Sequence, residues 1–62
     1  MELLIWKLRT QKGYSCRALA NKCGLSKSTI NNIENDKVSP TLAELEKIAK
    51  ALDCRIVDLF KE

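Results

Sequence analysis

The sequence predicts an all-α fold, a compact bundle of five short helices in a single domain over residues 1–62. Two observations predict it. The chain is 45% hydrophobic but contains only two glycines and one proline, which is typical of a small helical domain. Its apolar residues recur at helical spacing in short segments separated by turn-forming residues. None of these segments is long enough for an ordinary up-and-down bundle, so an orthogonal arrangement is expected.

The first two helices are each followed by a glycine. We expect them over residues 3–11 and 15–23, with Gly13, where a positive φ costs little, and Gly24 turning the chain after them. Ser15 is a good N-cap for the second helix, because its hydroxyl can accept a hydrogen bond from a backbone N–H of the first turn. The residues expected to face inward are Leu4, Ile5, Leu8, Ala18, Leu19 and Cys23.

The third helix carries the polar face that is best suited to contact another molecule. It is expected over residues 26–35, with Ser26 as N-cap, and Asn35-Asp36 can end it because such residues tolerate left-handed backbone. Ile30 and Ile33 form its inner side. At roughly 100° per residue, side chains that hydrogen-bond to base edges or phosphates fall around the opposite side. These side chains are Lys27, Ser28, Asn31, Asn32 and Asn35.

A capping box begins the fourth helix. After an extended connector at residues 38–40, the Thr41 hydroxyl can accept from the Glu44 backbone N–H while the Glu44 carboxylate reaches back to the N-cap. A short fifth helix over residues 56–60 is expected to close the core. The apolar residues of these two helices are Leu42, Leu45, Ile48, Ala49, Leu52, Ile56, Leu59 and Phe60.

The composition argues against several functional classes. Cys16, Cys23 and Cys54 form no C-x-x-C pair and the chain has no histidine, so neither a metal nor another cofactor is expected. We interpret the three as free thiols in a cytoplasmic protein, with Cys23 and Cys54 in the core. The longest apolar run is too short to span a membrane. Without a histidine, a metal cluster or a glycine-rich phosphate loop, neither an enzyme nor a small-molecule site is expected.

The two short helices joined at Gly24 have the helix-turn-helix pattern, and further motifs surround them. These motifs are Leu8-Arg9 with Gly13, Leu19-Ala20 with Cys23-Gly24-Leu25-Ser26, Ser28-Thr29-Ile30 with Ile33-Glu34-Asn35, Ser39-Pro40-Thr41-Leu42, Ile48-Ala49-Lys50-Ala51-Leu52 and Asp58-Leu59-Phe60. In their order and spacing, the whole chain resembles the phage-repressor/Cro type of helix-turn-helix proteins, the XRE family. The resemblance implies a lambda-repressor-like DNA-binding domain whose helices 2 and 3 form the helix-turn-helix.

The resemblance also implies which side chains contact DNA. The third helix would lie in the major groove and the second would cross the backbone. Base contacts are then expected from Lys27, Ser28 and Asn32, with Thr29 and Asn31 at the margins of the same face. Phosphate contacts are expected from Ser15, Arg17, Asn35 and Lys37. The alternative is that these side chains are solvated polar residues that contact no DNA. This alternative is strongest for Arg17 and Lys37.

By the same resemblance, Arg9 and Glu34 form a structural salt bridge between the first and third helices. The sequence departs from the family pattern at three positions that bear on a phosphate contact, a turn and a helix cap. Cys16 stands where a phosphate-binding glutamine is common in the family. Because a thiol is shorter and a weaker donor, one contact to the DNA backbone is in doubt. Asp36 replaces the usual glycine in a tight turn, and Arg55 replaces a capping serine or threonine.

Three apolar residues bear on assembly. Trp6 and Val57 occupy positions that are often polar in the family, and Leu3 flanks Trp6. Either these residues pack on each other, because the first and last helices are neighbours in this fold, or they form a self-association surface.

The function expected from these observations is regulation of transcription by sequence-specific binding to double-stranded DNA. Most simply the protein is a repressor that binds a pseudo-palindromic operator as a homodimer, and the net charge of +3 favours such an anionic partner. Alternatives within DNA binding are an antitoxin or a restriction-modification controller. A helical protein-interaction module without DNA binding is the alternative of another class, and a salt titration on duplex DNA distinguishes it.

Overall fold

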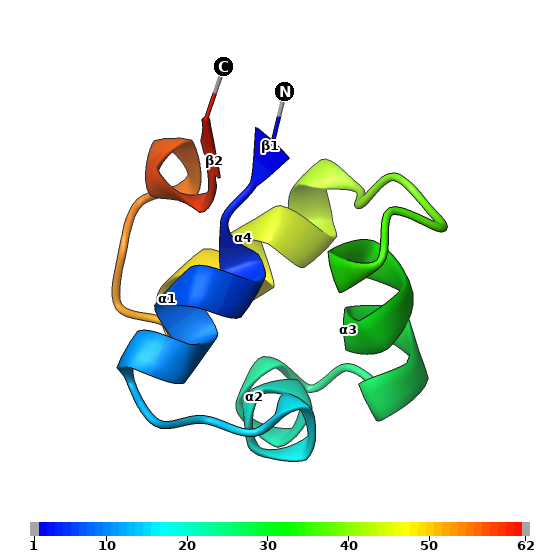
Figure 1. Cartoon of the computed structure of the whole chain (residues 1–62), viewed down its shortest axis with the longest axis vertical. Helices are drawn as coiled ribbons and strands as arrows, with labels where there is room; N and C mark the ends of the chain where they lie inside the picture. Colours follow the sequence, from blue (N-terminus) through cyan, green and yellow to red (C-terminus); the bar gives the residue numbers. More distant parts are fainter. Residues whose placement is uncertain (1, 62) are drawn as a thin grey trace.

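A computed structural model describes residues 2–61 as four α-helices, one 3₁₀ turn and a pair of very short strands (Figure 1). In chain order the elements are β1 (Glu2–Leu3), α1 (Ile5–Gln11), α2 (Cys16–Cys23), α3 (Lys27–Glu34), α4 (Leu42–Ala51), the 3₁₀ turn η1 (Ile56–Leu59) and β2 (Phe60–Lys61). The predicted bundle of short helices is confirmed.

The expectations for the two ends of the chain were wrong in detail. The first helix begins at Ile5 rather than at residue 3, and the fifth is a single 3₁₀ turn that ends at Leu59. The residues beyond these limits form an antiparallel pair of strands, β1 with β2, in which Glu2 lies opposite Lys61 and Leu3 opposite Phe60. Both ends of the chain therefore meet on one side of the bundle (Figure 1).

The predicted starts of α2, α3 and α4 are confirmed with their caps. Ser15 and Ser26 each accept a hydrogen bond from the backbone N–H three residues further on, both at 3.0 Å. Thr41 and Glu44 form the complete capping box, with bonds of 3.1 and 2.9 Å. Each such cap satisfies N–H groups that have no partner within the helix, and each stabilises its helix by about 1 kcal/mol. At the turn η1, where Arg55 provides no side-chain cap, the Asp58 carboxylate accepts from the Arg55 N–H at 3.0 Å.

The core lies between α4 and the elements packed around it. α4 packs against α2 and η1, and α2 packs in turn against α3. The largest fully buried side chains are Ile5, Leu19, Ile30, Ile33, Ile48, Leu52 and Leu59. All seven had been expected to face inward. α3 is thus held from one side only, and its other side remains open to solvent.

All three cysteines are free thiols. Cys23 is buried, as expected, and Cys54 is only partly buried against the core. Burial raises the pKa of the Cys23 thiol above its ordinary value, so this side chain stays neutral near pH 7. Among residues 2–61 no group of three or more potential metal ligands occurs. In the same part of the chain, no helix has the length and apolarity needed to cross a membrane.

Candidate nucleic-acid interface

α2 and α3 form a compact two-helix unit. α2 is followed by Gly24, which adopts a left-handed conformation with φ of +74°. The next residue, Leu25, donates its backbone N–H to the carbonyl of Ala20 at 3.0 Å and so closes the end of the helix. A side chain at Gly24 would be strained because L-residues rarely adopt this conformation. The turn therefore sets α3 at a defined angle to α2.

The two sides of α3 differ completely in burial. Ile30 and Ile33 are 0% and 1% exposed and face the core. At about 100° per residue, the direction opposite them is occupied by Ser28, Asn31 and Asn32. Ser28 and Asn31 are exposed and Asn32 is half-buried, while Lys27 is exposed in the first turn. We call this surface, made of Lys27, Ser28, Asn31 and Asn32, the outward face of α3.

Hydrogen bonds within α3 divide its polar side chains into two groups. The hydroxyls of Thr29 and Ser26 are 2.8 Å apart and share a hydrogen bond. Asn35 Nδ2 donates to Asn31 Oδ1 at 3.3 Å, so Asn31 is also engaged. Within the described residues, the side chains of the three expected base contacts take part in none of the hydrogen bonds found. These three are Lys27, Ser28 and Asn32. Their donors and acceptors are therefore available to a partner.

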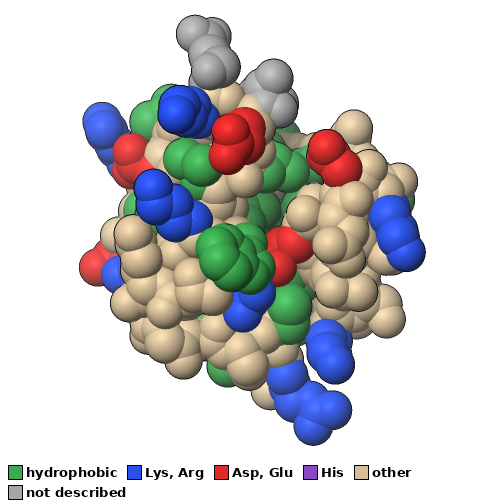
Figure 2. All heavy atoms as spheres, viewed as in Figure 1, with side chains coloured by type: hydrophobic (Ala, Val, Ile, Leu, Met, Phe, Trp, Pro, Cys, Tyr) green, Lys and Arg blue, Asp and Glu red, His purple; other side chains and the backbone are tan. Residues whose placement is uncertain are grey.

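The expected phosphate contacts lie at the start of α2 and at the end of α3. Arg17 lies in the first turn of α2, and Lys37 lies just beyond α3. Both are exposed, and within residues 2–61 neither forms a salt bridge. The Ser15 oxygen accepts from the Ala18 N–H, which leaves the hydroxyl free to donate. Figure 2 shows Lys and Arg side chains along the right and lower edges of the molecule, where Figure 1 places α3 and α2.

The expected pairing of Arg9 with Glu34 is present, and it joins α1 to the last residue of α3. Arg9 Nε and Nη2 donate to the two Glu34 carboxylate oxygens at 2.9 and 3.1 Å, and Arg9 Nη1 donates to the Tyr14 carbonyl at 2.9 Å. The side chains are only 10% and 7% exposed. The hydrogen bond to Glu34 raises the pKa of Arg9 above its ordinary value, although burial opposes it.

Sequence reasoning missed a third member of this cluster. The Cys16 Sγ lies 3.8 Å from Glu34 Oε1 and can donate its S–H to that carboxylate. Cys16 is half-buried, so its thiol contributes to the support beneath α3. No local pattern links residues 16 and 34, and a thiol is a weak donor whose partner is not evident from spacing.

The turn after α3 is formed as expected, but with a side chain in a position that suits glycine. Asp36 has φ of +62°, whereas Asn35 remains at −93°. Asp36 also places a negative charge next to Lys37 at the edge of the proposed contact surface. Asp53, after α4, has φ of +56° and was not anticipated.

We expect Asp36→Gly to raise the free energy of unfolding by up to about 1 kcal/mol, because glycine adopts this φ without steric cost. Denaturation in urea measures the change. Asp36→Asn is the matched control, since asparagine removes the charge but keeps a side chain at the same φ. Equal stabilisation by glycine and asparagine would show that the charge, and not the backbone, is the source of the effect.

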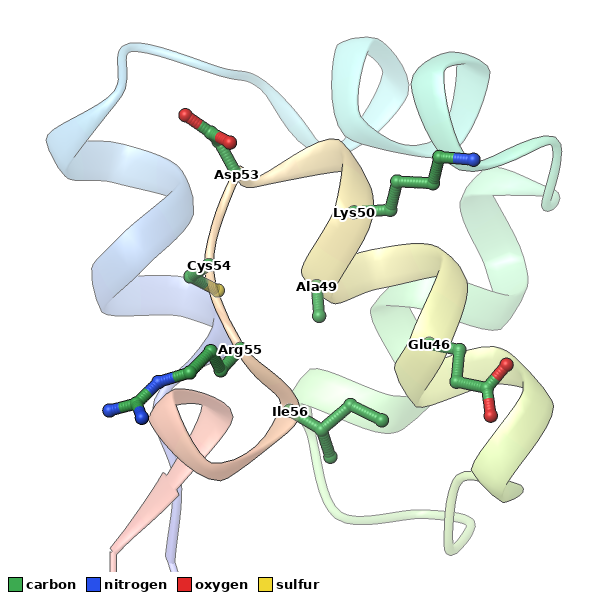
Figure 3. A pocket seen from close by; sticks show the side chains of 7 residues that line it. All are labelled: Glu46, Ala49, Lys50, Asp53, Cys54, Arg55 and Ile56. Atoms are coloured by element: carbon green, nitrogen blue, oxygen red, sulfur yellow. The ribbon is translucent and has the colours of Figure 1, made fainter.

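A hollow beside α4 does not form a second site. It is lined by residues of α4 and of the segment that leads into η1, among them Glu46, Lys50, Asp53 and Arg55. Figure 3 shows that these charged side chains point in different directions rather than towards a common point. Cys54 also lines the hollow, and burial raises the pKa of its thiol. The arrangement therefore offers no convergent set of groups for a ligand or for catalysis.

Comparison with known proteins agrees with this geometry. A family model described as Helix-turn-helix (HTH_3) matches residues 7–59. The HTH-type transcriptional regulator PuuR of Escherichia coli is 39% identical over 56 residues, which are 90% of this chain and 30% of that protein. The HTH-type transcriptional regulator SinR of Bacillus subtilis is 39% identical over 59 residues, which are 94% of this chain and 53% of SinR. The chain thus spans about a third to a half of these relatives.

Solved structures show the same arrangement of helices. The restriction-modification controller protein C.AhdI from Aeromonas hydrophila superposes with a TM-score of 0.88 and 36% identity, covering 90% of this chain and 85% of that one. The crystal structure of SinR in complex with DNA superposes with a TM-score of 0.82 and 37% identity, covering 86% of each chain.

Proposed function

This chain belongs to the helix-turn-helix family of DNA-binding transcriptional regulators, and we propose that it reads a specific operator with the outward face of α3. The observation that carries the proposal is that polar side chains on that face are accessible and have free hydrogen-bonding groups. Ser28 and Asn32 lie opposite the buried side of α3, and Lys27 is exposed in its first turn. The side chains of all three take part in none of the hydrogen bonds found within the described residues. DNA binding alone, with no catalytic step, accounts for the arrangement of polar side chains on this face.

Each of these side chains suits a particular contact in the major groove. Lys27 can donate to O6 and N7 of guanine, and Asn32 can pair with N6 and N7 of adenine. Ser28 can contact either kind of base or a phosphate. Thr29 and Asn31 are secondary, because Thr29 shares its hydroxyl hydrogen bond with Ser26 and Asn31 accepts from Asn35.

Phosphate contacts would hold the protein in register on the duplex. Arg17 lies in the first turn of α2 and Lys37 lies just beyond α3, and Ser15 and Asn35 add hydroxyl and amide donors. The N-terminal turns of α2 and α3 also present backbone N–H groups, which favour anions. These contacts carry no sequence information, but they supply much of the affinity and its dependence on salt.

We further propose that the protein acts in the cytoplasm as a homodimer on a pseudo-palindromic operator. Two copies related by a two-fold axis match two half-sites about one helical turn apart. Occupancy of such a site acts most simply as repression. The likeness to C.AhdI, which extends over 85% of that chain, favours control of a restriction-modification system as the second candidate. Both functions use the same DNA-binding face.

The proposal predicts a steep dependence of DNA binding on salt. The binding constant should fall linearly with salt concentration on a double logarithmic plot, as measured by fluorescence anisotropy of a labelled duplex. Arg17→Ala and Lys37→Ala should each weaken binding to all sequences alike and reduce the slope by about one charge. Lys50→Ala is the matched control, because Lys50 lies on α4 beside the hollow described above. Absence of DNA binding at low salt would contradict the proposal and favour a protein-interaction module.

A further inference from the structure

A second hollow lies where α2 packs against α4, and positive charge is concentrated around it. Its volume is about 290 Å³, and it is lined by Lys22 and Cys23 of α2 and by Lys47, Lys50 and Ala51 of α4. Three of the eight lysines of the chain therefore surround one small space. Among the described residues that line it, none is acidic. We call this site the basic hollow.

The three ammonium groups of the basic hollow have no counter-charge in the described chain. Within residues 2–61, neither Lys22 nor Lys47 nor Lys50 forms a salt bridge. Figure 3 shows the Lys50 side chain extending away from Asp53. Lys47 and Lys50 are three positions apart on α4, so they lie on the same side of that helix, where like charges repel each other. An anion bound between them would remove this repulsion.

Two contacts direct lysine side chains along the seam between the helices. Lys22 Nζ lies 5.5 Å from the centroid of the Tyr14 ring, and this cation–π contact restricts the Lys22 side chain. Burial raises the pKa of the Cys23 thiol and the charge of Lys47 lowers it, so the Lys47 ammonium group lies near α2. Positive groups therefore approach the hollow from both helices.

Stabilisation of helix ends accounts for only part of this arrangement. Lys22 and Lys50 lie in the last turns of α2 and α4, where positive charge is favourable. Lys47, however, lies in the middle of α4. At the end of α4 the Cys54 N–H donates to the Ala49 carbonyl at 3.0 Å, so backbone groups close this helix without a lysine. The lysine ammonium groups thus remain available to a ligand.

We propose that the basic hollow binds a small anion with adjacent phosphoryl groups, either free diphosphate or an ester of it. The ammonium groups of Lys22, Lys47 and Lys50 would donate to its phosphoryl oxygens. Lysine binds phosphate as a compact point charge, whereas carboxylates are matched best by the planar fork of arginine, which does not line the hollow. The volume lies just below the roughly 300–1,000 Å³ typical of sites for drug-sized ligands, so it suits a small anion.

The basic hollow faces a different direction from the proposed DNA contacts. Lys22 follows Arg17 by five positions on α2, which turns it by about 140° around the helix axis. Lys47 and Lys50 lie on α4, which carries none of the expected base or phosphate contacts. The inference therefore does not rest on the proposed function.

The hollow is also separate from the three residues expected from the sequence to mediate self-association. Leu3 of β1 is half-buried, while Trp6 of α1 and Val57 of η1 are 61% and 59% exposed. None of the three lines the basic hollow. A test of anion binding therefore needs no change at these positions.

Isothermal titration calorimetry with inorganic diphosphate at constant ionic strength tests the inference. We expect saturable binding of one ion per chain. Lys22→Gln, Lys47→Gln and Lys50→Gln should each weaken it about fivefold, as expected for loss of one exposed ion pair, and the triple variant should abolish it. Lys7→Gln is the matched control and should bind as the unaltered chain does, because it removes the same charge from an exposed lysine of α1 outside the hollow.

Two further titrations identify the source of the phosphoryl groups and the place of binding. A nucleoside diphosphate that binds more tightly than inorganic diphosphate would point to an ester as the ligand, and one that binds more weakly would point to the free anion. Lys37→Ala should leave diphosphate binding unchanged, since Lys37 belongs to the proposed DNA contacts. Equal binding by the unaltered chain and the triple variant, or equal weakening in Lys7→Gln or Lys37→Ala, would overturn the inference.

Thermal unfolding separates a ligand site from a purely structural role of the lysines. Bound diphosphate should raise the Tm of the unaltered chain, because it binds only the folded state, and should leave the Tm of the triple variant unchanged. A triple variant that is less stable, together with no effect of diphosphate on either chain, would overturn the inference and assign the lysines to the helix ends alone. Failure of either chain to bind duplex DNA would overturn only the proposed function.

Discussion

Arg9→Ala is expected to lower the free energy of unfolding by about 3–5 kcal/mol, because it leaves the Glu34 carboxylate buried without its cationic partner. Among residues 2–61, Glu34 would keep only the weak Cys16 thiol contact, and the Tyr14 carbonyl would lose the donor that it has at 2.9 Å. A domain of 62 residues has a total stability of about 3–9 kcal/mol. Urea denaturation followed by circular dichroism should therefore show a variant that has lost a third or more of its stability, and one that is largely unfolded if the unaltered chain lies at the lower end of this range.

A double variant separates the cost of an unpaired charge from the value of the pair. Replacing both partners, as in Arg9→Met with Glu34→Leu, removes both charges and fills the site with side chains of similar size. We expect this variant to be much more stable than Arg9→Ala, since buried ion pairs are often replaced by apolar groups without loss. A cost below about 1 kcal/mol for Arg9→Ala would mean that the pair behaves as an exposed one, contrary to its burial.

Asn32→Ala is expected to have the largest effect on sequence discrimination. Loss of a bidentate contact to a base reduces discrimination against the wrong base by about 1–3 kcal/mol, which corresponds to roughly 5- to 150-fold in relative affinity. Competition between the preferred duplex and duplexes altered at single base pairs measures this ratio. The half-buried Asn32 side chain takes part in none of the hydrogen bonds found in the described chain, so its truncation should change stability little.

Asn31→Ala is the matched control for this experiment. Asn31 is also on the outward face, but its side chain accepts from Asn35. We expect a smaller change in discrimination than for Asn32→Ala. If both variants kept the discrimination of the unaltered chain, Asn32 would not be a residue that reads a base.

The sequence could predict the helices because their signals are local. Ser15, Ser26 and Thr41 mark helix starts through hydrogen bonds that reach only three residues along the chain. The buried side of α3 follows from the helical spacing of Ile30 and Ile33 alone. Both kinds of signal lie within a few residues, so tertiary structure is not needed to recognise them.

The features that could not be predicted depend on contacts between distant parts of the chain. The strands β1 and β2 are two residues long and join opposite ends of the chain, so they show no alternating pattern. The bond between Cys16 and Glu34 and the basic hollow arise only when separate elements pack together. The engagement of Asn31 by Asn35 likewise depends on side-chain conformation and not on residue type.

Selection of bound duplexes from a random pool tests most directly whether the outward face of α3 reads DNA bases. With the unaltered chain we expect enrichment of a two-fold symmetric sequence whose half-sites are about 10 base pairs apart. A chain in which Lys27, Ser28 and Asn32 are all replaced by alanine should bind the pool with the same dependence on salt but enrich no sequence. The same enriched sequence from both chains, or no enrichment by the unaltered chain, would contradict the account.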